Sequence, residues 1–336
     1  MRDTDFAYYL TRYFTFYLSG NRDFSENTIK SYRDTFKLLL IYFNDVLKVA
    51  ANKITLDKID YDNVVGFLGW LESERKNSAS TRNQRLAAIH AFCRYLQIEN
   101  PDNMSHYQHV LMIPLKKCPQ PLTEYLTPEM LKLILQEPDK TTLSGRRDLI
   151  LLSTLYDTGA RVQELCDLKV RNLRLSAPAI VNLTGKGEKT RSVPLMKNTV
   201  LLLEQYLREN HLDVASNPDH PLFFNQYRLK MTRGGIAYII NKYVQSAHAK
   251  SAMIPEKVTP HVFRHTKAMH LYQSGIPLIY IRDILGHVSL VTTQVYAKID
   301  TELKREALEK AYPEITDTKL PDWNDNNSLM SMLLKL

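Results

Sequence analysis

The residues best suited to chemistry are basic side chains and one phenol, spread along the second half of the chain: Arg161, Lys186, His261, Arg264, His287 and Tyr296. Two arginines can clamp the non-bridging oxygens of a phosphodiester in a bidentate way, which lysine cannot do. A tyrosine can attack phosphorus, but its pKa of about 10 leaves only roughly one molecule in a thousand as phenolate at neutral pH. Such a nucleophile needs a base and a positive field, which histidine and lysine can supply.

Short motifs surround these residues. Arg161 closes Thr158-Gly159-Ala160-Arg161, and Lys186 lies in Thr184-Gly185-Lys186-Gly187. In His261-Val262-Phe263-Arg264-His265 the first histidine and the arginine are spaced i, i+3, so both share one face of a helix expected to begin at Pro260. His287 follows a glycine, and Tyr296 lies nine residues later in a short apolar helical pattern.

A metal centre is not expected among these residues. His261 and His265 have the i, i+4 spacing of a metal-binding pair, but no Glu stands in the H-E-x-x-H position and no third ligand is near in the sequence. The composition points instead to electrostatic catalysis, in which fixed cations stabilise the charge that develops on a phosphoryl group.

Helices must position this chemistry, and residues 1–111 predict a helical bundle. Four amphipathic stripes fall over residues 10–18, 25–43, 60–71 and 80–96. Ser25 or Asn27 is expected to cap the second helix, Asp60 the third, and Ser80 or Thr81 the fourth.

The start of the fourth helix carries candidate contacts to nucleic acid. Thr81, Arg82 and Arg85 lie at a helix N-terminus, where free amides bind phosphate and arginines can read guanine edges. Lys30 and Arg33 on the second helix are weaker candidates. The alternative is an ordinary solvated helix cap.

Three further segments follow the bundle. Prolines and lysines without periodicity predict an extended linker over residues 112–126, after which Thr127-Pro128 begins a new helix. Residues 127–312 predict a second domain, in which a helical run ends at Gly159 and a β-hairpin over 180–183 and 192–195 carries Lys186 in its turn. Residues 313–336 predict a flexible tail ending in a short Leu/Met helix that Ser328 caps.

Composition and charge limit the classes of function. The sequence has 336 residues, enough for two domains, and no apolar run long enough to span a membrane. Cys93, Cys118 and Cys166 stand alone, which favours a reduced, cytoplasmic protein without disulfides or zinc. Residues 116–312 hold 28 Lys and Arg against 19 Asp and Glu, whereas residues 1–115 hold 14 against 13. A basic second domain fits a polyanionic partner, most simply nucleic acid.

The order and spacing of these motifs resemble the tyrosine recombinase (phage integrase) family, most closely its Xer-type members. The stretch 85–92 looks like the DNA-facing helix of the family's core-binding domain, and Phe263 stands where the family usually has leucine. The resemblance implies a mainly α protein with a small β-sheet, in which a SAM-like core-binding domain precedes an integrase-type α+β catalytic domain.

The resemblance also implies roles for the residues. Arg161 and Arg264 would clamp the phosphate, and Tyr296 would attack it to form a 3′-phosphotyrosine. His261 would be the base, Lys186 the general acid on the departing oxygen, with Lys189 as the fallback, and His287 would contact the phosphate or orient the tyrosine. Glu164, one turn after Arg161, would hold its neighbours in place.

Partners follow from the same resemblance. It implies double-stranded DNA sites, no metal, no ATP, and four protomers on two sites, with each C-terminal helix docked into a neighbour; such a protein would be nucleoid-associated. The alternatives are a catalytically idle DNA-binding or architectural protein of the same fold and a type IB topoisomerase-like enzyme. The DNA target, the biological task and an accessory directionality factor stay open.

Overall fold

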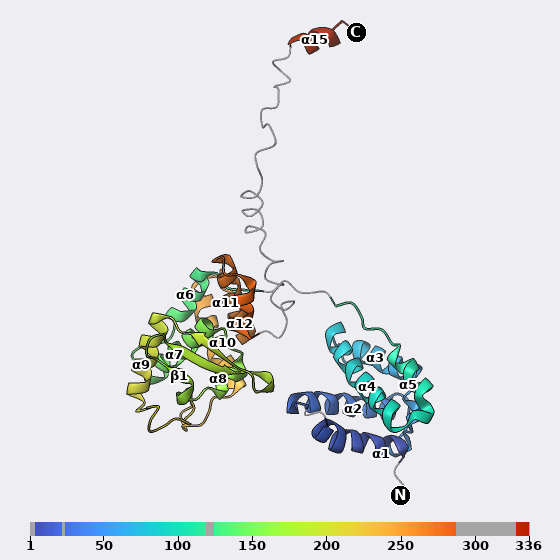
Figure 1. The fold of residues 1–336 in the computed structure, drawn as a ribbon. Helices are drawn as coiled ribbons and strands as arrows, with labels where there is room; N and C mark the ends of the chain where they lie inside the picture. Colours follow the sequence, from blue (N-terminus) through green and yellow to red (C-terminus); the bar gives the residue numbers. More distant parts are fainter. Residues whose placement is uncertain (1–3, 22–23, 119–123, 287–326, 336) are drawn as a thin grey trace. The chain divides into compact units, whose positions relative to one another are not determined.

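The structure is a computed structural model, and it describes residues 4–21, 24–118, 124–286 and 327–335. The chain divides into two compact units, Met1–Pro121 and Leu122–Leu336 (Figure 1). Both are mainly helical, and the second also holds a small sheet, so the predicted fold class is confirmed. No helix in the described ranges is long and apolar enough to cross a membrane.

The first unit is a bundle of helices around α4 (Ala79–Glu99), which contacts α2, α3 and α5. The remaining elements are α1 (Asp5–Arg12), the π-helical η1 (Tyr13–Asn21), α2 (Glu26–Asp45), η2 (Ala51–Lys53), η3 (Leu56–Lys58), α3 (Tyr61–Ser73), η4 (Pro101–Asn103) and α5 (Met104–Leu111). Aromatic rings fill the core, with Phe92 of α4 against Phe36 and Tyr13 at centroid distances of 5.1 and 5.2 Å. The stripe predicted for each helix is the face that this core buries.

Local sequence signals were sufficient to predict some of the helix N-caps. Ser25 caps α2 and Asp60 caps α3, as predicted, each accepting a hydrogen bond from a backbone amide three residues later. The predicted cap of α4 is wrong: Ser78 fills that position, and its Oγ accepts from the amide of Thr81 at 3.3 Å. Ser80 and Thr81 therefore lie inside the first turn of α4. Helix α5 was not predicted.

The second unit combines helices with a three-stranded antiparallel sheet in the order β1-β2-β3. The strands are β1 (Leu173–Arg174), β2 (Ile180–Thr184) and β3 (Thr190–Pro194), and the last two form the predicted hairpin with Val181 opposite Val193. The helices are α6 (Pro128–Gln136), α7 (Leu143–Thr158), α8 (Val162–Asp167), α9 (Lys197–Glu209), α10 (Arg233–Lys250), α11 (Pro260–Gln273) and α12 (Leu278–Leu285), with short turns η5 (Val170–Asn172) and η6 (Lys186–Glu188).

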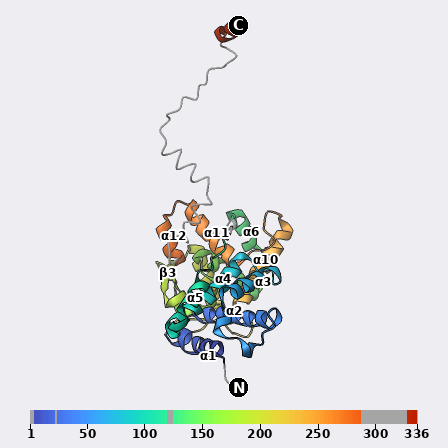
Figure 2. The same cartoon turned by 90° about the vertical axis from the view of Figure 1, so that its right-hand side faces the viewer.

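Helix α7 lies in the core of this unit. It is buried along most of its length and contacts α6, α9 and α11. Helix α12 lies beside α11 and next to β3, as both views show (Figures 1 and 2). This places the end of α7, the start of α8, the second turn of α11, the end of α12 and the hairpin around one point.

The segment between the two units is held firmly at each end. On the first unit, Asn83 of α4 makes two hydrogen bonds with the backbone of Lys116, at 2.8 and 3.0 Å. On the second, the amide of Leu126 donates to Thr266 Oγ1 at 3.0 Å, and its carbonyl lies 2.9 Å from His270 Nε2. Since Thr266 and His270 belong to α11, the chain enters the second unit on the helix that carries His261 and Arg264.

Candidate functional site

Arg161 is fixed by the carboxylate one turn after it. It is the N-cap residue of α8, and its amide donates to Glu164 Oε2 at 2.8 Å. Its guanidinium Nη1 donates to Glu164 Oε1 at 2.8 Å, while about a third of the side chain, 36%, stays exposed. Glu164 is thus in the holding position that the sequence predicts.

Arg264 is almost completely buried, with 4% of its surface exposed. It lies in the second turn of α11 and reaches two backbone oxygens on other elements. Nη1 donates to the carbonyl of Gly159 at the end of α7 at 2.7 Å, and Nη2 donates to the carbonyl of Leu285 at the end of α12. A charged side chain so deep in a protein is stabilised by such hydrogen bonds, and here they also tie α7 and α12 to α11.

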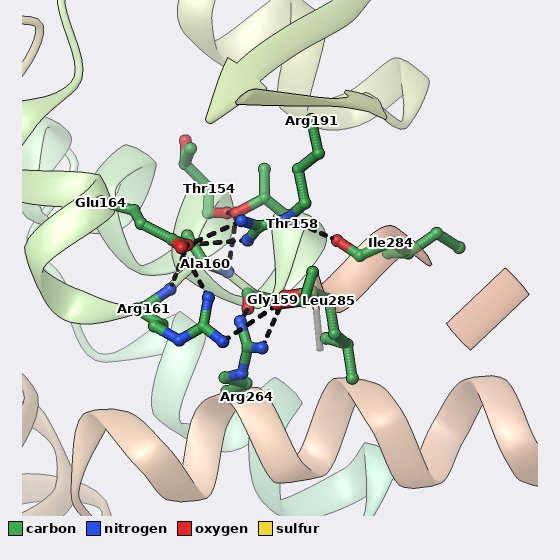
Figure 3. A network of polar contacts seen from close by, with 11 residues as sticks. Thr154, Thr158, Gly159, Ala160, Arg161, Glu164, Arg191, Arg264, Ile284 and Leu285 are labelled. Carbon is green, nitrogen blue, oxygen red and sulfur yellow. Dashed lines mark hydrogen bonds and ion pairs between the residues drawn. The ribbon is translucent and has the colours of Figure 1, made fainter. Parts of the chain in front are cut away.

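The last turn of α12 gathers arginines from three different elements (Figure 3). The carbonyls of Ile284, Leu285 and Gly286 each accept a hydrogen bond from a different guanidinium: Arg191, Arg264 and Arg161, at 2.8, 2.5 and 3.1 Å. The C-terminus of a helix carries partial negative charge, so cations there are favourable.

Gly286 is required at the end of this helix for two reasons. Its φ of +64° is left-handed, which glycine adopts without strain. A Cβ at this position would lie 2.9 Å from Cδ of Arg191, closer than ordinary side chains approach. The glycine of the sequence motif Gly286-His287 therefore has a structural cause.

Arg191 was missed by the sequence analysis. It lies in β3, with only 12% of its side chain exposed, and donates through Nη1 and Nη2 to both oxygens of Glu164 at 2.9 and 2.7 Å. The strand was predicted to begin one residue later, at Ser192, so Arg191 lay outside both predicted strands. Its basic side chain next to the predicted strand was the signal that could have drawn attention to it.

The hairpin turn that carries Lys186 lies against this cluster. A Cβ on Gly185 would come within 2.9 Å of Glu164 Oε1 and 3.6 Å of Arg161 Nη1, so the backbone next to Lys186 touches the Arg161–Glu164 pair. The Lys186 side chain is not among the described ones. Lys189, the fallback, is exposed at the end of the turn.

The charge balance of the cluster is positive. Glu164 is the one carboxylate that bonds to these arginines among the described residues. Burial favours its neutral form, but the hydrogen bonds and charges of Arg191 and Arg161 outweigh burial and hold the pKa of Glu164 below its usual range. Among the described residues, three guanidinium groups surround one ionised carboxylate, so positive charge outweighs negative charge here, which suits an anion.

The histidines of α11 have different surroundings. His261 lies in the first turn and is exposed, one turn before Arg264 on the same helix. Burial, together with the charges of His261 and Arg264, lowers the pKa of His265. Burial lowers the pKa of His270 as well, and its Nδ1 lies 2.9 Å from the hydroxyl of Tyr156. Within the described ranges no three His, Cys, Asp or Glu side chains come together as metal ligands.

Two predicted residues, His287 and Tyr296, lie outside the described residues. The described chain reaches Gly286, so His287 follows directly on the carbonyl that Arg161 binds. The roles of both residues stay predictions.

The candidate DNA contacts of the first unit fall into two groups. Lys30 and Arg33 are exposed on α2, beside Glu26 and Asp34 at 3.3 and 3.5 Å. Arg82, in contrast, is 7% exposed beside Glu72 of α3.

Arg85 is half-buried and donates to the Ser31 carbonyl and to Thr35 Oγ1 of α2. Thr81 is partly buried, and its amide bonds to the cap residue Ser78. Arg82 and Arg85 are therefore used in joining helices of the first unit, whereas Lys30 and Arg33 are accessible to a ligand.

The C-terminal helix was predicted from its Leu/Met pattern and is present as α15 (Asn327–Leu333). The predicted cap is wrong, because the helix begins at Asn327 and Ser328 lies inside its first turn. Met330, Met332, Leu333 and Leu334 are each more than half exposed. A short helix with exposed apolar side chains is typical of a segment that is buried elsewhere.

Comparisons with known proteins point to one family along nearly the whole chain. Residues 124–302 match the phage integrase family, and residues 11–100 match the phage integrase N-terminal SAM-like domain. Tyrosine recombinase XerD of Listeria monocytogenes serotype 4b is 32% identical over 301 residues, covering 89% of this chain and 96% of that protein. Tyrosine recombinase XerC of Oceanobacillus iheyensis is 30% identical over 309 residues, covering 91% and 96%.

Solved structures agree with these matches. The XerH site-specific recombinase, in a post-cleavage complex with a palindromic difH substrate, superposes with a TM-score of 0.66 and 26% identity. That match covers 87% of this chain and 82% of the XerH chain.

Proposed function

Because the chain belongs to the phage integrase family of tyrosine recombinases, we propose that it cuts and rejoins double-stranded DNA at a specific site through a 3′-phosphotyrosine intermediate. The observation that carries this proposal is the arginine cluster. Arg161 and Arg264 come from separate helices, and both bond to the end of α12, directly before His287. That two of the family's catalytic positions, Arg161 and Arg264, meet at the end of one helix in a positively charged setting supports the proposal.

The two arginines would bind the scissile phosphate. Each guanidinium has five donors in a planar fork. Arg161 uses Nη1 to bind Glu164 and Nη2 to bind Gly286, and its side chain remains partly exposed, so further donors are left for a ligand. A fixed donor near the phosphorus stabilises the charge that develops on its oxygens without reorganising during the reaction.

Proton transfer would involve three further residues. Tyr296 attacks phosphorus, and the bond to the 5′ oxygen breaks as the bond to the tyrosine oxygen forms. His261, exposed at the start of α11, takes the tyrosine proton. Lys186 gives a proton to the departing 5′ oxygen, since its hairpin turn lies on the Arg161–Glu164 pair. His287 contacts the phosphate or orients the tyrosine.

Rejoining is the reverse reaction, with the 5′ hydroxyl of another strand as the nucleophile. The covalent phosphotyrosine conserves the energy of the phosphodiester bond, so the reaction requires no ATP, and the arginines supply the charge that a metal ion would otherwise provide. Lys30 and Arg33 on α2 are the accessible candidates for DNA contacts by the first unit. Residues 112–126 would act as the linker between the core-binding domain (1–111) and the catalytic domain (127–312).

Assembly would depend on the tail, residues 313–336. We infer that α15 buries its exposed Leu and Met side chains in a neighbouring protomer, so that four protomers on two DNA sites form a closed ring. Each large side chain that becomes fully buried contributes roughly 1.5–3 kcal/mol, partly offset by ordering the tail.

A nicked suicide DNA substrate tests the function. The site is first obtained by selecting bound sequences from a random pool with the purified protein. A recombinase forms a covalent complex at one position of that site and joins strands between two sites. Binding without a covalent complex would show a catalytically idle DNA-binding protein, and covalent trapping without site preference would show a topoisomerase-like enzyme. Either result contradicts the proposal.

A further inference from the structure

Arg191 joins the parts of the cluster that the reaction uses. Its guanidinium donates to both oxygens of Glu164, and its Nε donates to the carbonyl of Ile284 at 2.8 Å (Figure 3). It therefore connects three elements that are distant in sequence: β3, α8 and the end of α12. Arg161 and Arg264 make different connections, since Arg161 joins α8 to the end of α12 and Arg264 joins α11 to α7 and α12.

We propose that Arg191 is a positioning residue of the recombinase reaction, which holds the Lys186 hairpin and the end of α12 together and neutralises Glu164 so that Arg161 remains available to the phosphate. This inference rests on the proposed function. Arg191 would not touch the DNA, because its bonds are directed to Glu164 and to the backbone of α12.

Arg191 helps to fix the last turn of α12 in place. In this turn, Arg191 binds the carbonyl of Ile284, and Arg161 binds the carbonyl of Gly286. The end of α12, up to Gly286, is thus held from the hairpin side as well as from the α8 side. The hairpin is fixed by the same contact, because Arg191 lies in β3 and Lys186 lies in the turn before that strand.

The electrostatic part of the inference concerns Glu164, whose side chain is 3% exposed. Its Oε1 accepts from Arg191 at 2.9 Å and from Arg161 at 2.8 Å. A buried carboxylate requires neutralisation, and among the described residues Arg161 alone would supply it without Arg191. Arg161 would then be bound to an otherwise unpaired carboxylate, and the positive charge available to a phosphate would fall by one.

Lysine could not replace Arg191 fully. The planar guanidinium makes two parallel bonds to one carboxylate and a third to a carbonyl, whereas an ammonium group is a point charge without this fixed fork. The guanidinium of Arg191 is also packed closely against α12. A Cβ added at Gly286 would come within 3.0 Å of Arg191 Nη1.

The experiment compares Arg191→Ala and Arg191→Lys with a matched control, Arg174→Ala. Arg174 lies in β1 of the same sheet and bonds to the carbonyl of Pro178, away from the cluster. Single-turnover formation of the covalent complex is measured on the selected suicide site, with site affinity from gel shifts. We expect Arg191→Ala to slow cleavage by on the order of 10–100-fold, as for residues that support a reacting group. Affinity should change less than threefold (about 0.65 kcal/mol), Arg191→Lys should recover part of the rate, and Arg174→Ala should match the wild type.

A second variant separates positioning from folding. If Arg191 acts by neutralising Glu164, then Glu164→Gln added to Arg191→Ala should cleave several-fold faster than Arg191→Ala alone. A role confined to stability predicts the opposite, because the second change removes another buried hydrogen-bonding partner. Cleavage by Arg191→Ala within threefold of the wild type, or a double variant no faster than the single one, would overturn the inference.

Amide hydrogen exchange in the free protein needs no DNA. Peptides covering residues 184–192 and 278–286 should exchange faster in Arg191→Ala than in the wild type, and peptides of α9 should not. Unchanged exchange in both regions would also overturn the inference. If the wild type forms no covalent complex, the proposed function fails, but the exchange result still decides whether Arg191 holds the two elements together.

Discussion

Replacing Glu164 with glutamine should lower the stability of the second unit more than breaking an exposed ion pair would. The change preserves size and removes the negative charge that Arg161 and Arg191 share. Glutamine can accept through one oxygen only, so its amide nitrogen would face a guanidinium donor. Arg191, with a side chain 12% exposed, would remain buried without an anionic partner.

The magnitude follows from burial. Removing one partner of a buried ion pair costs about 3–5 kcal/mol, because the other charge is left uncompensated. A unit of this size shifts its melting temperature by about 2–4 °C for each kcal/mol, so Glu164→Gln should melt about 6–20 °C lower. The control is Glu209→Gln, whose pair with Arg146 at 3.0 Å leaves both side chains about a quarter exposed. Such pairs contribute at most about 1 kcal/mol.

The assay is calorimetric unfolding of the wild type and both variants between pH 7 and pH 3. A carboxylate whose pKa is lowered by folding stabilises the protein above its unfolded pKa of about 4.3. That contribution is lost as the pH falls through the lower pKa of the folded state. The gap between wild type and Glu164→Gln should therefore be full at pH 7 and shrink towards pH 3. A gap below about 2 °C at pH 7, or one that does not change with pH, would refute this reasoning.

Three other predictions concern the reaction and the assembly. Arg161→Ala and Arg264→Ala should each slow cleavage by on the order of 10²–10³-fold while weakening binding less, and rates within a few-fold of wild type would show that the phosphate clamp lies elsewhere. Lys186→Ala should recover cleavage on a substrate whose 5′ leaving oxygen is replaced by sulfur, which needs no general acid; failure to recover would point to Lys189 or to a positioning role. Deleting residues 326–336 should preserve binding to one site but impair recombination of a two-site plasmid, so wild-type recombination would make the tail a passive appendage and loss of a cooperative melt would indicate packing within the same protomer.

Local signals predicted much of the helical framework. Caps at Asp60 and Thr127 were identified, and Ser25 was one of two candidates, because each side chain satisfies a free amide of the following turn, which is a property of adjacent residues. The cap of α4 was misplaced because its first turn contains several hydroxyl side chains, and only the fold selects Ser78 among them. Strand β1 was missed because it is two residues long and shows no alternation.

The candidate site was harder to predict from the sequence. Motif resemblance identified Arg161 and Arg264, and the i, i+3 spacing set His261 and Arg264 on one helix. The partners of the arginines, by contrast, are mostly backbone carbonyls, as at Gly159 and Leu285, and a carbonyl has no residue type to recognise. Arg191 was missed for the related reason that its contacts, Glu164 and Ile284, lie 27 and 93 positions away.

The central claim is that a tyrosine of this chain becomes covalently attached to DNA, and mass spectrometry of the trapped complex tests it most directly. The complex formed on the nicked suicide site is digested with protease and nuclease, and the peptide that retains a nucleotide is sequenced. The proposal predicts a 3′-phosphonucleotide on Tyr296, and predicts that Tyr296→Phe binds the site with nearly unchanged affinity but forms no complex. A nucleotide on another tyrosine, such as the exposed Tyr280 of α12, or a covalent complex formed by Tyr296→Phe, would contradict it.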